Sequence, residues 1–91
     1  MDLLKYLQKR STPISGHNLA KTFNTESSTI RKEIQRLRAK GEPICSNRNG
    51  YFYSENVDDV RKVVQSLENR IKTQQNTLQG LIKWVGDRNG G

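Results

Sequence analysis

Five basic side chains crowd into one short stretch of the chain, TESSTIRKEIQRLRAKGEPI, which spans residues 25–44. They are Arg31, Lys32, Arg36, Arg38 and Lys40. The apolar residues Ile30, Ile34 and Leu37 of the same stretch recur at the i, i+4, i+7 spacing of one helix face. A helix over about 26–40 would bury that thin seam and turn most of its cations toward solvent. The residue types on its outer face suit the binding of a polyanion.

The charge of the whole chain agrees with an anionic partner. The 91 residues carry 16 Lys and Arg against 9 Asp and Glu, a formal net charge of +7. Residues 1–54 hold ten basic and four acidic side chains, whereas residues 55–91 hold six and five. A strongly basic segment is the electrostatic signature of a nucleic-acid-binding domain. We therefore expect residues 1–54 to bind the anion and residues 55–91 to have another task.

Several functional classes are disfavoured by composition. Cys45 is the only cysteine, so the chain has no internal disulfide and suits a reducing cytoplasm. One Cys and one His cannot close a zinc site, and no grouping typical of a nucleophilic enzyme is evident. No apolar run reaches membrane-spanning length, and the N-terminus lacks a signal-peptide core. We expect a cytoplasmic non-enzyme with no metal, cofactor, small-molecule ligand or membrane partner.

Three helices and a hairpin are predicted in residues 1–54. A first helix over 2–10 is followed by a break at Ser11-Thr12-Pro13 and a short extended piece at Pro13-Ile14. Ser15 is a good N-cap for a second helix that ends at Phe23, where Asn24 tolerates a left-handed backbone. The third helix stops at Gly41. PICSNRNGYFYS then predicts two short strands joined by an NRNG turn.

Residues 55–86 predict a long helix, capped by Asn56, with an apolar seam of alternating three- and four-residue steps. The seam residues are Val57, Val60, Val64, Leu67, Ile71, Gln74, Leu78, Leu81 and Val85. Two interpretations compete: the helix pairs with its copy as a coiled coil, or it folds back on its own domain. About 29 residues of helix would be about 43 Å long, more than a small domain covers, which favours a homodimer. The polar Gln74 could fix the register. Gly86 is expected to end the helix, and residues 87–91 to form a disordered tail.

Three helices with a tight turn before the third, followed by a hairpin, form a winged helix-turn-helix pattern. The sequence resembles the type-11 helix-turn-helix family, which includes the N-terminal DNA-binding domain of the biotin operon repressor. The matching residues are Ser15, Gly16, Leu19, Ala20, Ile30, Lys32, Ile34, Leu37, Arg38, Gly41, Gly50 and Tyr51. Asn24, Thr25, Glu26 and Ser27 depart from the family pattern. Glu26 stands where the family has a capping Ser, so Thr25 is the expected cap of the third helix.

The resemblance implies a mostly α-helical winged domain that places its third helix in the major groove of duplex DNA. The expected DNA contacts are Ser15, His17, Ser27, Ser28, Arg31, Lys32, Gln35 and Arg36, with Asn47, Arg48 and Asn49 at the tip of the wing. Competing interpretations are simpler. The basic helix could be a solvated face, the two Asn of the tip could only shape the turn, and the stem of Arg38 could cover the core edge.

The predicted function is that of a homodimeric, sequence-specific regulator of transcription, and the resemblance extends to small versions found in phages and mobile elements. No effector-binding domain is predicted, so biotin chemistry does not carry over. One alternative is a module that binds or organises a replication origin. A second alternative is a protein-interaction adaptor that meets an acidic partner through the basic helix.

Overall fold

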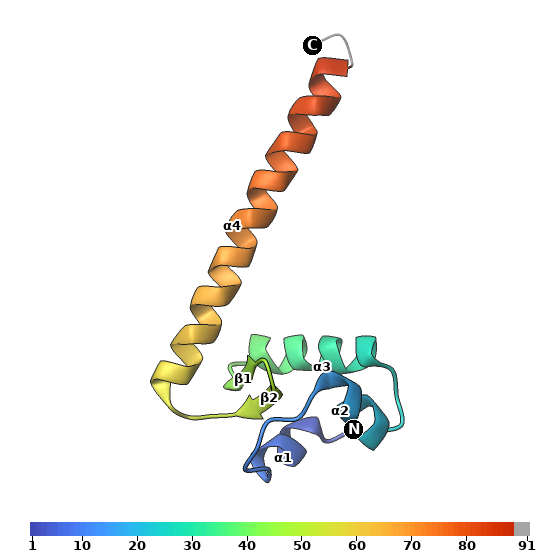
Figure 1. The fold of residues 1–91 in the computed structure, drawn as a ribbon, viewed down its shortest axis with the longest axis vertical. Coiled ribbons are helices and arrows are strands. Elements are labelled where there is room, and N and C mark those ends of the chain that lie inside the picture. The colour runs from blue at the N-terminus through green and yellow to red at the C-terminus, as the bar shows by residue number, and fades with distance from the viewer. Residues whose placement is uncertain (89–91) are drawn as a thin grey trace. The chain divides into compact units, whose positions relative to one another are not determined.

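The computed structural model describes residues 1–88, which fall into two units, Met1–Arg61 and a second that begins at Lys62. The elements are α1 (Leu3–Gln8), α2 (Gly16–Thr22), α3 (Ser27–Ala39), β1 (Ile44–Asn47), β2 (Gly50–Tyr53) and α4 (Val57–Arg88) (Figure 1). The predicted fold class is confirmed: the chain is mostly helical, with one antiparallel hairpin and a long C-terminal helix.

The turn between α2 and α3 is built by backbone hydrogen bonds. Asn24 has φ +51°, the left-handed conformation expected from its sequence. The N–H of Asn24 donates to the carbonyl of Lys21 at 3.2 Å, and that of Thr25 to the carbonyl of Ala20 at 2.9 Å. This is the paired closure of a Schellman motif. Because Thr25 still belongs to the end of α2, the predicted cap of α3 was wrong by one residue. Glu26 occupies the N-cap, without a side-chain capping bond.

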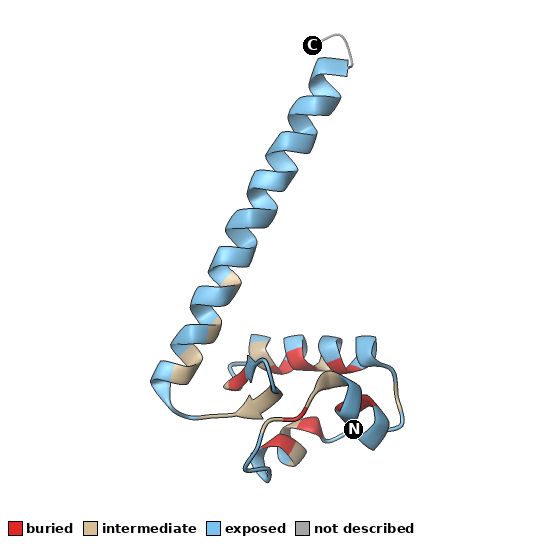
Figure 2. Cartoon of the chain, in the orientation of Figure 1, coloured by how far each residue is buried: buried red, intermediate tan, exposed pale blue. Residues whose placement is uncertain are grey.

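The core of the first unit lies among α1, α2, α3 and the hairpin. Its buried residues are Leu3, Leu7, Ile14, Leu19, Ala20, Ile30, Ile34, Leu37 and Ile44 (Figure 2). The predicted seam of α3 supplies three of them. The partly buried rings of Tyr6 and Phe23 meet edge to face at the rim, with centroids 5.4 Å apart. Burying each Leu or Ile contributes about 1.5–3 kcal/mol, so this seam fixes which face of α3 is turned outward.

The hairpin is anchored to the linker before α2. Its strands pair from Ile44 with Tyr53 to Asn47 with Gly50. Ile14 adds a single bridge to Tyr51, with N–H to carbonyl distances of 3.0 and 2.8 Å, so the extended piece predicted at Pro13-Ile14 is present. Gly50 has φ +129°, and a Cβ there would lie 2.3 Å from the carbonyl of Ile14. The chain therefore tolerates only glycine where the wing meets the linker.

The long helix α4 begins as predicted, because the side chain of Asn56 accepts the N–H of Asp58 at 2.9 Å. It continues past the expected end at Gly86 through Arg88. Residues 87 and 88 are therefore helical rather than part of a tail, and the rest of the predicted tail, 89–91, lies outside the described residues. Within residues 1–88, no helix combines the length and the apolarity that crossing a membrane requires.

Candidate nucleic-acid interface

The outer face of α3 carries six of the residues predicted to contact DNA. All six are exposed: Ser27, Ser28, Arg31, Lys32, Gln35 and Arg36. Ile30 and Ile34, on the opposite side, are 0 and 1% exposed. The side chains of Arg31, Lys32 and Gln35 make no hydrogen bond or ion pair with any residue in the described range 1–88. Their donors can therefore reach a phosphate or a base edge without breaking an internal contact.

Arg36 differs from these neighbours because it is paired with Glu33, one turn earlier on α3. Its Nε lies 3.0 Å from Oε2 of Glu33, and a second guanidinium nitrogen contacts Oε1. The hydrogen bond from Arg36 lowers the pKa of Glu33, and the same bond raises the pKa of Arg36. A guanidinium has five N–H donors. The pair therefore uses one edge of Arg36 and leaves further donors for a ligand.

Arg38, by contrast, belongs to the scaffold. Its Nε donates to the carbonyl of Ile44 at 2.8 Å, and a terminal nitrogen lies 3.4 Å from Oγ of Ser46. Its guanidinium carbon is 6.0 Å from the centroid of the Tyr51 ring. These contacts tie the last turn of α3 to β1 and β2. The structure thus favours the structural interpretation of Arg38 over a DNA contact.

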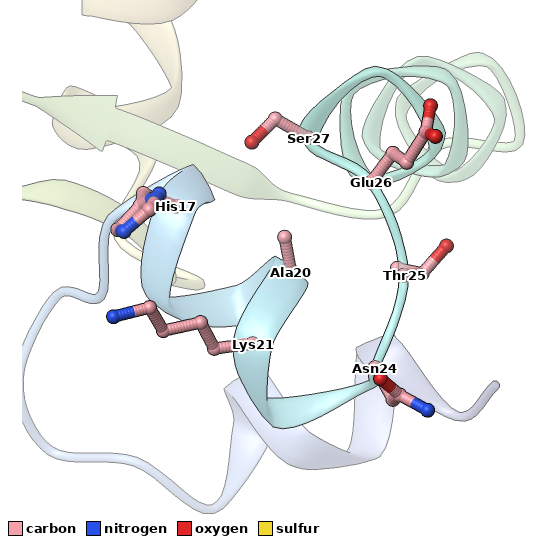
Figure 3. Close-up of a pocket in the computed structure, with 7 residues that line it drawn as sticks. All are labelled: His17, Ala20, Lys21, Asn24, Thr25, Glu26 and Ser27. Atoms are coloured by element: carbon pink, nitrogen blue, oxygen red, sulfur yellow. The ribbon is translucent and has the colours of Figure 1, made fainter.

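A shallow hollow of about 550 Å³ lies where α2 meets the start of α3. It is lined by His17, Ala20, Lys21, Asn24, Thr25, Glu26 and Ser27. Figure 3 shows His17 and Lys21 projecting from α2 on the same side, with Ser27 at the first position of α3. The predicted contacts His17 and Ser27 are thereby brought together. Lys21 was missed, although its place four residues after His17 puts both on one helix face.

Two further predicted residues have structural roles of their own. Oγ of Ser15 accepts the N–H of Asn18 at 3.1 Å, so this partly buried hydroxyl caps α2 as expected. Oδ1 of Asn47 accepts the N–H of Asn49 at 2.8 Å and shapes the hairpin turn. Arg48, between Asn47 and Asn49, is exposed, and its side chain makes no hydrogen bond or ion pair to the part of the chain that the structure describes. At the tip, Arg48 is therefore the side chain best placed to bind an anion.

Within the described residues, few other side chains could bind a metal ion or act as a nucleophile. No cluster of three or more His, Cys, Asp and Glu side chains within residues 1–88 could hold a metal ion. Cys45 is 1% exposed, and burial raises the pKa of its thiol. A buried neutral thiol is a poor nucleophile, so Cys45 serves the core. The site consists of cations and polar donors on a rigid helix, which can bind phosphates and read base edges.

Comparison with known proteins agrees with this geometry. The family described as the HTH domain matches residues 1–52, more than half of the chain. The chain belongs to the HTH domain family. Within the matched range, the helix-turn-helix itself is α2, the Asn24 turn and α3, and β1 and most of β2 form the wing. The HTH domain therefore contains every predicted DNA contact.

A curated relative of this HTH domain is the transcription repressor NadR of Bacillus subtilis (strain 168). It is 37% identical over 51 residues, which cover 56% of this chain. The match spans only 28% of the length of NadR. The likeness thus concerns about one domain's length of NadR and does not extend to the rest of that repressor.

Proposed function

We propose that this chain is a sequence-specific, duplex-DNA-binding regulator of transcription that acts as a homodimer. The observation that carries the proposal is the outer face of α3, where Arg31, Lys32 and Gln35 stand exposed and unpaired among the described residues, on an HTH domain. The likeness to a transcription repressor supports a regulatory role.

The proposed docking follows from the width of an α-helix, which fits the major groove of B-form DNA. α3 lies in the groove, with Ser28, Arg31, Lys32 and Gln35 toward base edges and phosphates. His17 and Lys21 face the phosphates beside the groove, and Arg48 on the wing reaches the flanking backbone. If about six phosphates are neutralised, log affinity falls with log salt concentration at a slope near −5.

The proposed homodimer rests on the apolar stripe of α4. Its seam residues Val57, Val64, Ile71, Leu78, Leu81 and Val85 are between 47 and 62% exposed in the single chain. A stripe of this length on one helix is the pattern that a second helix covers in a coiled coil. Each dimer would carry two reading helices, so the target would contain two related half-sites.

Selection of bound duplexes from a random pool, followed by footprinting on the source genome, tests the proposed activity. The expected result is a motif made of two half-sites, located beside promoters. Sites clustered at a replication origin would assign the alternative role in replication. Failure to enrich any sequence at moderate salt would refute sequence-specific binding and favour the protein-interaction adaptor.

Leu67→Asp tests the homodimer, because it places a charge in the centre of the seam. Ser66→Asp is the matched control, since it adds the same charge one residue away and off the seam. The expected result is a monomeric Leu67→Asp variant by light scattering, with weakened binding to a two-half-site duplex through lost avidity. Because dimer formation depends on protomer concentration, a wild-type chain that is still monomeric at about 100 µM would refute the homodimer.

A further inference from the structure

The apolar face of α4 widens toward its C-terminus. Over 57–71 the apolar residues occupy the two seam positions of the heptad, with partly buried Val63 as the single addition. Over 78–85 the seam residues Leu78, Leu81 and Val85 are joined by Ile82 on one flank and Trp84 on the other. Ile82 and Trp84 are 53 and 58% exposed. The two ends of one helix thus carry two different surfaces.

The width of the C-terminal surface exceeds what one partner helix covers. At about 100° per residue, Leu78, Leu81 and Val85 span about 60° of the helix, and Ile82 with Trp84 extends the span to about 160°. A two-stranded coiled coil needs only the narrow seam, whereas helices of a larger bundle are apolar on one or both flanks as well. A simple pair would leave Ile82 and Trp84 in water on each helix.

The types of side chain at the seam positions of α4 also change toward the C-terminus. In the first part of α4, β-branched Val64 and Ile71 alternate with Leu67, an arrangement that favours two strands. Leu78 breaks that alternation, whereas Leu81 and Val85 follow it. The one change of side-chain type therefore falls at the start of the wider surface.

The charge pattern indicates which molecule covers this surface. Residues 73–86 contain one charged side chain, Lys83, which lies on the opposite side of the helix from the seam. Arg88 borders the surface at its C-terminal edge, with its guanidinium carbon 4.8 Å from the centroid of the Trp84 ring. Around Leu78 and Ile82, several copies can approach one another without repulsion between like charges, while a partner of opposite charge has little to attract it there. Gly80 adds a second argument. It stands one turn before Trp84, and apart from its own helix backbone no atom of the described residues lies within 4 Å of the position its Cβ would take. A glycine inside a helix costs about 1 kcal/mol, and here it leaves room for a close neighbour.

We infer that residues 78–85 join two dimers into a tetramer through a four-helix bundle. This inference rests on the proposed homodimer. Val57 to Ile71 hold the chains in pairs, and the wide surface around Ile82 and Trp84 holds pairs together. The tetramer carries four HTH domains, so one tetramer binds two operators at once. These operators lie either far apart on one duplex or on two separate duplexes.

The test is the mass of the 91-residue chain by sedimentation velocity and native mass spectrometry from about 1 to about 100 µM, measured together with the fluorescence of Trp84, the only tryptophan of the sequence. The expected result for the wild type is a tetramer with blue-shifted emission. Ile82→Glu is expected to be a dimer with red-shifted emission and unchanged affinity for a single operator. Lys83→Glu, which places a charge off the apolar surface, is the matched control and should stay tetrameric.

Helix content by circular dichroism shows whether Ile82→Glu is folded, and Trp84→Gln provides a second variant on the other flank. A wild-type dimer with water-exposed Trp84 throughout the range would overturn the inference and leave the homodimer standing. A wild-type monomer would overturn the tetramer and the homodimer together. Tetramers that persist in both Ile82→Glu and Trp84→Gln would also contradict the inferred tetramer. A dimer whose Trp84 emission shifts only when anionic lipid vesicles are added would assign the surface to a membrane instead.

Discussion

The guanidinium of Arg36 donates to both carboxylate oxygens of Glu33, and its Nε lies 3.0 Å from Oε2. The pair holds one cation of α3 in a fixed position, whereas Arg31 and Lys32 on the same helix are exposed. Glu33 also adds a negative charge next to the surface that would face phosphates. It is therefore expected to oppose indiscriminate binding while it orients Arg36.

Glu33→Gln should raise the affinity for random duplex about two- to fivefold at moderate salt, because one charge that repels phosphate is lost. Discrimination between the selected operator and random duplex should fall. Fluorescence anisotropy with both duplexes measures the two effects. Glu68→Gln makes the same change of charge on α4 and should leave both values as in the wild type. Unchanged binding of random duplex by Glu33→Gln would contradict the proposed role.

The same pair gives a pH dependence with a defined sign. Because the folded-state pKa of Glu33 is lowered from its ordinary value of 4.5, the pair stabilises the fold above that pH. This contribution is lost as the pH falls through the folded-state pKa. The difference in unfolding free energy between wild type and Glu33→Gln should therefore be present at pH 7 and shrink as the pH falls below 4.5. Urea titrations at a series of pH values measure it, and a difference that grows on acidification would be inconsistent with the ion pair.

Arg38→Ala should destabilise the HTH domain by about 1–2 kcal/mol, since the bond to the carbonyl of Ile44 and the link to the wing are both lost. Arg31→Ala removes the same type of side chain from the exposed face of α3 and should change stability by less than about 0.5 kcal/mol. Chemical denaturation measures both. Equal effects of the two substitutions would show that Arg38 is not part of the scaffold.

Gly50→Ala should be the most damaging small substitution in the wing, at about 3 kcal/mol or more. The new Cβ would meet the carbonyl of Ile14 at 2.3 Å, and the residue would also be held at positive φ. Gly41→Ala separates the two causes, because Gly41 has φ +93° but nothing within 4 Å of its Cβ position. Backbone strain alone should lower the unfolding free energy of Gly41→Ala by about 1–2 kcal/mol. Thermal unfolding compares them, and a milder effect at Gly50 than at Gly41 would rule out the close approach of wing and linker.

The thiol of Cys45 should react slowly with an aromatic disulfide reagent in the native chain and rapidly in urea. Burial raises the pKa of this thiol above its ordinary value of 9.0, so the native state at pH 8 holds little thiolate. The folded state is favoured while the thiol is neutral, and that contribution declines as the pH rises through 9.0. Absorbance of the released thiolate measures the rate. Native reaction as fast as in urea would place Cys45 outside the core.

Much of the first unit was predictable because local rules and tertiary packing agree there. The seam of Ile30, Ile34 and Leu37 determined which face of α3 is exposed, and Asn24 and Gly41 marked the helix ends through their left-handed backbone. The start of α3 was not predictable from capping preference alone. Thr25 is the better cap by residue type, but its N–H is already used to close α2.

The pairing of side chains on the site was less accessible from sequence. The i, i+3 spacing of Glu33 and Arg36 allowed an ion pair without requiring one, and sequence alone could not separate Arg36 from Arg31. Arg38 met Ile44 only because the strand turns back beside the end of α3, which is a tertiary contact. Lys21 could have been predicted from its spacing of four residues from His17, which places both on one face of α2. The hollow that they line, however, forms only where α2 and α3 meet.

The outer face of α3 is tested most directly by replacing Arg31 and Lys32 together with alanine and measuring affinity for the selected operator. The chain contains its own control, because Arg61 and Lys62 on α4 form the same dipeptide and their replacement removes the same charge. The Arg31→Ala/Lys32→Ala variant should bind at least about 100-fold more weakly with an unchanged circular-dichroism spectrum, and the Arg61→Ala/Lys62→Ala variant should stay within about threefold of the wild type. Equal losses in the two variants, or normal binding by the first, would contradict the assignment of α3 as the reading helix.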